Sequence, residues 1–125
     1  MPSLSYLRRT ALAVAVLFVA STATLQAMPL SELGKMPKEE RAQFISAAVS
    51  MTAYIAAADG DVTWGRCVAA WYFGPERNGI GDGVDAIASE ILVAERVDPK
   101  KFHIEGIILG LAEKACGSRS SAQSK

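Results

Sequence analysis

The sequence predicts an all-α protein, a small four-helix domain linked by one disulfide and preceded by a cleaved signal peptide. Three observations favour this class. Apolar residues recur at three- and four-residue steps, no stretch alternates convincingly with period two, and the 125 residues include two cysteines. We expect a signal peptide over residues 1–27, a helical domain over 28–117 and a disordered polar tail over 118–125.

The first residues have the order of a secretory signal peptide. Arg8 and Arg9 precede an uncharged apolar run over residues 11–20, and small residues follow it. That run falls short of the roughly 20 residues of a membrane-spanning helix, so we expect no stable membrane anchor after cleavage. The favoured cleavage position is after Ala27, with Ala23 as the alternative. The leader predicts a periplasmic or secreted protein.

The charge of the mature chain argues against nucleic acid as a partner. The whole chain has 13 Lys and Arg and 13 Asp and Glu, and the leader removes two arginines, so the mature net charge is 11 − 13 = −2. Its basic residues are scattered rather than clustered, which leaves no basic patch for phosphates.

The first main helix is predicted from Pro37 to just before Gly60. Pro37 suits a first helical position, and Glu39 and Glu40 suit the positive end of the helix dipole. A short turn over 31–33 is expected before it, closed by Gly34. The predicted buried stripe consists of Phe44, Ala48, Met51, Ile55 and Ala58.

The second main helix is predicted to run to Phe73, capped by Asp61 or Thr63. Gly74 and Pro75 end it, and the glycine-rich stretch over 74–83 is expected to be a flexible crossing between helices. The predicted buried stripe consists of Trp64, Cys67, Val68, Trp71 and Tyr72.

Two further helices complete the predicted domain. Asp82 is expected to cap the third helix, Asp98 to end it, and Pro99 to begin the fourth. The inward residues of the third helix are predicted to be Val84, Ile87, Ile91 and Ala94. Those of the fourth are Phe102 or Ile104, then Ile107, Ile108, Leu111 and Ala115. Gly106 and Gly110 are expected to let a neighbouring helix pack closely.

The two cysteines are predicted to form a disulfide. Cys67 and Cys116 both lie on apolar faces of a chain sent to a compartment where disulfides persist. The alternative is a nucleophilic Cys67 with His103 as base, activated by the neighbouring Arg66. Arg66 points to another side of the helix, so the disulfide is favoured. We therefore expect no catalytic residues and no enzyme activity.

Neither a metal nor a cofactor is expected. Residues 59–61 resemble the start of a calcium loop, but Ala70 occupies the twelfth position, where a glutamate is needed. The glycines at 79, 81 and 83 lack the strand and the Lys-Ser or Lys-Thr pair of a phosphate-binding loop. His103 is the only histidine and is expected on the surface.

The aromatic end of the second helix is the predicted partner-binding site. Trp71, Tyr72 and Phe73 are consecutive and spread over about 200° of the helix circumference, so they cannot all face one core. With Arg77 and Asn78 in the following loop, they are residue types that anchor protein interfaces. The alternative is that all of them pack within the domain.

From Tyr54 to Cys116, the order of YIAAADG, Cys67, Pro99 and a final EKACG resembles the periplasmic type VI secretion amidase immunity (Tai) family. This resemblance implies a helical, disulfide-linked protein that occupies the active site of a cell-wall amidase toxin. It assigns no individual inhibitory residue.

A second likeness is to the HdeA acid-stress chaperones. TWGRC and IEGIILGLAEKAC are similar to the surroundings of the two cysteines in that family. This likeness implies a periplasmic chaperone in which acid neutralises carboxylates and releases apolar surface, and 13 acidic residues would permit that mechanism.

Overall fold

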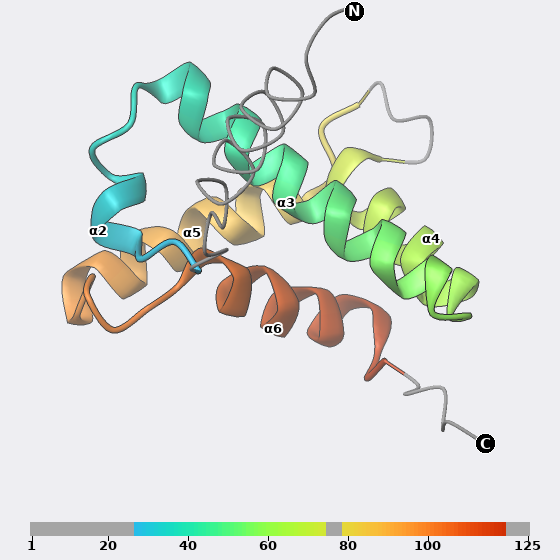
Figure 1. Ribbon diagram of the computed structural model, residues 1–125. Coiled ribbons are helices and arrows are strands. Elements are labelled where there is room, and N and C mark those ends of the chain that lie inside the picture. The colour runs from blue at the N-terminus through green and yellow to red at the C-terminus, as the bar shows by residue number, and fades with distance from the viewer. Residues whose placement is uncertain (1–26, 75–78, 120–125) are drawn as a thin grey trace, which may run out of the picture.

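The computed structural model describes residues 27–74 and 79–119, and in these ranges the protein is all-α (Figure 1). The short helix α2 spans Leu30–Leu33, and α3 spans Lys38–Ala58. They are followed by α4 (Val62–Phe73), α5 (Asp82–Val97) and α6 (Ile104–Cys116). The four main helices and the short turn before them are confirmed. Residues 1–26 and 120–125 of the predicted signal peptide and tail lie outside these ranges.

The helices enclose one apolar core. Helix α4 contacts α3, α5 and α6, while α2 packs against α5 at the opposite end of the molecule (Figure 1). Every helix therefore contributes buried side chains, and α2 contributes two that the sequence analysis did not place in the core. The core consists of Leu30, Leu33, Val49, Ala53, Ala56, Trp64, Val68, Tyr72, Ile87, Ile91, Ala94, Ile104, Ile107, Ile108 and Ala112.

Helix α6 begins five residues after Pro99, which corrects the predicted start of the fourth helix. The preceding segment pairs with the N-terminal segment instead. Leu30 N–H donates to Phe102 O at 3.0 Å, Ile104 N–H donates to Met28 O at 3.3 Å, and Pro29 and His103 form an isolated antiparallel bridge. Ser31 N–H also donates to Pro99 O at 3.1 Å, so the Pro99 and Phe102 carbonyls accept from the N-terminal segment instead of from the next turn of a helix.

The inward faces of the last two helices are largely as predicted. Ile87, Ile91 and Ala94 are buried on α5, and Ile104 rather than Phe102 starts the buried face of α6. Two details were wrong. Gly81 rather than Asp82 occupies the N-cap of α5, and Ala112 rather than Ala115 is buried on α6.

Three interactions fix the C-terminal end of α6 and the residues after it to α4 and to the end of α3. The predicted Cys67–Cys116 disulfide is present, with 5.9 Å between the two Cα atoms. Trp64 Nε1 donates to Gly117 O at 2.8 Å, and Arg119 forms an ion pair with Asp59 beyond the end of α3. The C-terminal segment therefore joins the ends of three helices.

In the glycine-rich stretch over 74–83, Gly79 is exposed with open space around it, whereas Gly81 and Gly83 are tightly packed. Gly81 N–H donates to Tyr72 O at 3.2 Å. A Cβ atom added to Gly83 would lie 2.8 Å from the Trp71 ring, closer than such contacts allow. The expectation of a flexible crossing is therefore wrong for this part of the stretch. Residues 75–78 lie outside the described ranges.

Candidate functional site

Helix α3 has two apolar faces, and the face that is buried is not the predicted one. Val49, Ala53 and Ala56 are buried, whereas Met51 is 57% exposed and Ile55 is 45% exposed. The predicted stripe is correct only in its first half, where Phe44 and Ala48 are half-buried against the core. The exposed residues of its second half lie on the opposite side of the helix from the buried face.

Close contact between α3 and α4 explains which face is buried. A Cβ atom added to Gly65 would lie 2.5 Å from Ala53 O and 3.4 Å from Ala57 Cβ. The two backbones can approach this closely only because the residues between them are small. Larger side chains such as Met51 and Ile55 would hold the helices apart, so they face outward.

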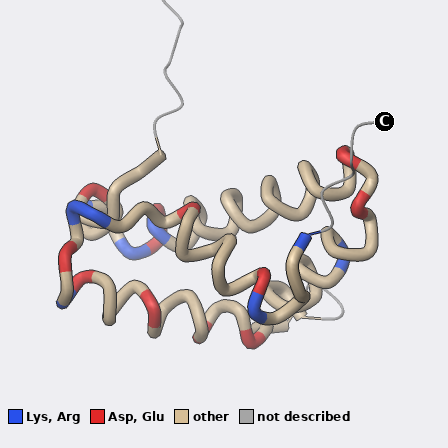
Figure 2. Tube along the Cα trace, turned by 90° about the horizontal axis from the view of Figure 1, so that it is seen from below, with Lys and Arg blue, Asp and Glu red and all other residues tan. Residues whose placement is uncertain are grey.

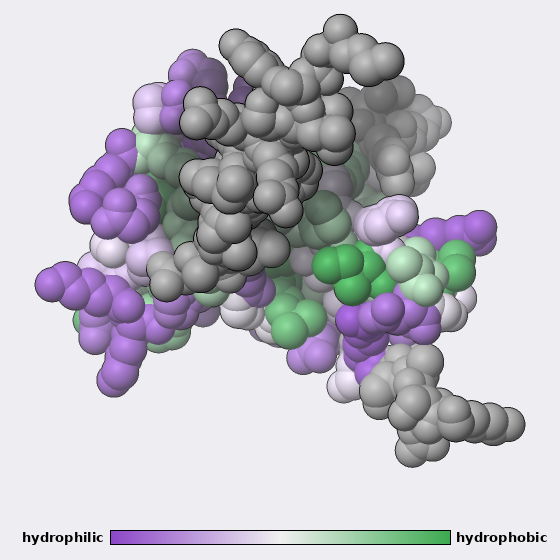
Figure 3. Space-filling model, in the orientation of Figure 1, coloured by the Kyte–Doolittle hydropathy of each residue, from purple (hydrophilic) through white to green (hydrophobic). Residues whose placement is uncertain are grey.

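The outward face of α3 forms an apolar surface without charged side chains. Residues 42–58 include no Asp, Glu, Lys or Arg, and Tyr54 is 71% exposed. Figure 2 shows α3 without charge beyond its first turn, whereas acidic residues recur along α5, and Figure 3 shows hydrophobic atoms over the second half of α3. We call the exposed set the α3 stripe: Ala47, Met51, Tyr54, Ile55 and Ala58.

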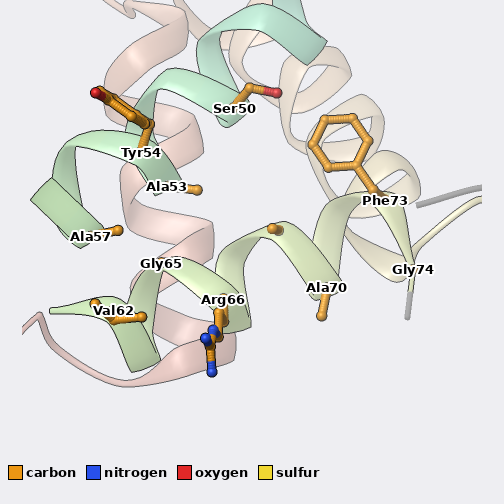
Figure 4. A pocket seen from close by; sticks show the side chains of 11 residues that line it. Ser50, Ala53, Tyr54, Ala57, Val62, Gly65, Arg66, Ala70, Phe73 and Gly74 are labelled. Atoms are coloured by element: carbon orange, nitrogen blue, oxygen red, sulfur yellow. The ribbon is translucent and has the colours of Figure 1, made fainter. Parts of the chain in front are cut away.

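A groove of about 680 Å³ runs between α3 and α4 beside this stripe (Figure 4). Tyr54 belongs to both the stripe and the groove, and Phe73 lies at the end of α4 that the groove reaches. Small residues form the region between them. The lining residues are Ser50, Ala53, Tyr54, Ala57, Val62, Gly65, Arg66, Ala69, Ala70, Phe73 and Gly74. We call the groove and the α3 stripe together the α3–α4 face.

The three consecutive aromatic residues of α4 have different environments. Tyr72 is 6% exposed, and its hydroxyl lies 3.3 Å from Ser46 Oγ on α3. Trp71 is half-buried against Gly83 of α5. Phe73 is half-buried, lines the groove, and its ring centroid lies 4.7 Å from that of Tyr72. Of these three predicted partner-binding residues, only Phe73 belongs to the α3–α4 face.

The other two predicted partner-binding residues, Arg77 and Asn78, lie outside the described ranges. Gly74, three residues before Arg77, is the last described residue of this segment and lines the groove. Their contribution to a binding site stays a prediction.

The residues considered for catalysis are not brought together as a thiol and a base. Cys67 is bonded to Cys116, so it carries no free thiol. His103 is exposed at the N-cap of α6. Within residues 27–74 and 79–119, no group of three or more His, Cys, Asp or Glu side chains could hold a metal ion.

A second hollow lies on α6 beside Gly106 and Gly110. No described atom lies within 4 Å of a Cβ added to either glycine, so the expected close packing of another helix there is wrong. Among the described helices, none is long and apolar enough to cross a membrane.

No family model matches this chain, and neither a curated protein nor a solved structure matches it. The geometry of the α3–α4 face therefore carries the functional argument. The sequence did reveal three exposed residues of this face, because Met51, Ile55 and Ala58 belong to the apolar stripe predicted for α3. Periodicity alone assigned these residues to the core.

Proposed function

We propose that the mature chain is a non-catalytic protein that binds another protein through the α3–α4 face. The observation that carries this proposal is the uncharged outward side of α3, where Met51, Tyr54 and Ile55 are exposed together. Contiguous apolar surface of this kind is characteristic of interaction sites in soluble proteins. Phe73 adds an aromatic side chain at the end of the adjoining groove.

The proposed partner is a second exported protein, a cell-wall amidase toxin. The signal-peptide pattern supports export from the cytoplasm, to a compartment where the Cys67–Cys116 disulfide would persist. The resemblance to the amidase immunity family supports an inhibitor that occupies the active site of such an enzyme. The disulfide also favours binding over catalysis, because it leaves Cys67 without the thiolate that nucleophilic attack requires.

Affinity capture from a periplasmic extract at neutral pH, with the disulfide intact, tests the proposed function. We expect one near-stoichiometric partner, identified by mass spectrometry as a cell-wall hydrolase. One molar equivalent of the protein should abolish release of peptides from peptidoglycan by that enzyme. Retention of many unrelated proteins, and only after acidification, would instead support an acid-stress chaperone function.

A further inference from the structure

The α3–α4 groove contains one cationic side chain without a partner among the described residues. Arg66 lines the groove, and its guanidinium group forms neither an ion pair nor a hydrogen bond with residues 27–74 and 79–119. No carboxylate lines the groove, so its one formal charge is positive.

The groove has the length and floor that a short helix requires. It extends from Val62 to Gly74 along the whole of α4, whose 12 residues correspond to about 18 Å. Ala53, Ala57 and Gly65 form a floor of small residues between two closely packed helices. A third helix can lie along such a channel and pack its own side chains into it.

The apolar and charged side chains of the groove lie in different places, so an amphipathic helix would match it better than a uniformly apolar one. Figure 4 shows Tyr54 on the α3 side and Arg66 projecting from α4 away from α3, with Phe73 at one end. A helix across this surface would place apolar side chains near the aromatic rings and one polar side chain near Arg66. An acidic residue at that position would be attracted to the guanidinium group, and a basic residue would be repelled.

We propose that the groove receives an amphipathic helix of about three turns from the partner protein, with an Asp or Glu side chain opposite Arg66. This inference rests on the proposed protein-binding function and assigns the chemistry of the bound segment. The attraction is local to Arg66, because the mature chain as a whole has a net charge of 11 − 13 = −2.

The test uses two fluorescein-labelled amphipathic helical peptides of 14 residues, with Ala and Leu on one face and Gln on the other, that differ only in one Glu or Lys on the apolar face. Fluorescence anisotropy with the mature, disulfide-linked protein should show about fivefold tighter binding of the Glu peptide, the effect of about 1 kcal/mol. Arg66→Gln should remove the preference and Arg66→Glu should reverse it. Arg96→Glu, an exposed site on α5, serves as the matched control and should preserve it.

Several results would overturn the inference. They are equal binding of the two peptides, no binding of either at about 1 mM protein, and a preference that survives Arg66→Glu. Sedimentation of the protein alone provides a further test. If the wild type self-associates and Ala70→Trp, which fills the groove at an exposed position, abolishes the association, the occupant is a second copy and the inference is wrong.

Partner capture separates failure of this inference from failure of the proposed function. A partner retained equally by wild type, Arg66→Glu and Ala70→Trp would leave the binding function intact and exclude the groove as its site. No partner retained by the wild type would contradict the proposed function itself, whatever the two peptides do.

Discussion

Neighbouring residues of α4 differ sharply in what they can contribute to binding. Tyr72 lies in the core and its hydroxyl forms a hydrogen bond with Ser46 on α3, whereas Phe73 lines the groove. The sequence predicted that the aromatic residues could not share one environment, because consecutive helical positions point in different directions. It could not predict which residue is exposed, since that depends on the close approach of α3 to Gly65.

Alanine substitutions at these two positions should separate stability from binding. Tyr72→Ala removes a buried ring and should lower the free energy of unfolding by about 3–5 kcal/mol, measured by urea denaturation. Phe73→Ala should cost roughly 1–2 kcal/mol, because the ring is half-buried, and should weaken partner capture at least tenfold. Undiminished capture by a folded Phe73→Ala variant would exclude this ring from the interface.

Two glycine substitutions should have opposite effects on stability. In Gly83→Ala, the added methyl group would lie 2.8 Å from the Trp71 ring, so we expect a loss of about 1–3 kcal/mol. In Gly106→Ala, the methyl group meets no atom of another described element in the first turn of α6, so we expect a gain of about 0.5 kcal/mol. Thermal unfolding of both variants checks this, and destabilisation by Gly106→Ala would contradict the open environment of that glycine.

At the scale of elements, features set by local interactions were more predictable than features set by contacts between distant segments. Asp61 caps α4 by accepting from Trp64 N–H at 3.1 Å, a local interaction that the sequence reveals. The start of α6 depends on pairing with residue 28, over 70 positions away, and local patterns cannot show this. The buried face of α3 likewise depends on a neighbouring helix, because both of its faces are apolar.

The disulfide between α4 and α6 should contribute a large part of the stability. Its cysteines are 49 positions apart, and a loop of this length is worth about 4 kcal/mol on the chain-entropy model. We expect Cys67→Ala with Cys116→Ala to lower the free energy of unfolding by about 2–4 kcal/mol. Trp64→Phe, which loses the bond to Gly117 O and part of a buried ring, should cost about 1–3 kcal/mol.

Urea denaturation of these two variants, with the oxidised and reduced wild type as references, measures both effects. A reduced wild type as stable as the oxidised protein would contradict the proposed contribution of the disulfide. A larger loss for Trp64→Phe than for the double cysteine variant would mean that the tryptophan stabilises the end of α6 more than the covalent link does.

For the whole molecule, the sequence predicted the class and the disulfide but located only part of the candidate site. Phe73 was among the predicted partner-binding residues, while Met51 and Ile55 were assigned to the core. An apolar stripe on a helix fits burial in the domain and burial by a partner equally well. The structure shows that this stripe is exposed, because small residues on the other face of α3 form the contact with α4.

The central claim is that the α3–α4 face binds a protein partner, and comparative capture tests it most directly. The wild type, a Met51→Lys and Ile55→Lys variant, and a Leu92→Lys and Val93→Lys control on α5 would be compared at neutral pH. All four positions are exposed, so the variants should remain folded. We predict that the wild type and the control retain the same near-stoichiometric partner and that the α3 variant retains at least tenfold less. Equal retention by the α3 variant would show that the α3 stripe is not part of the partner-binding surface.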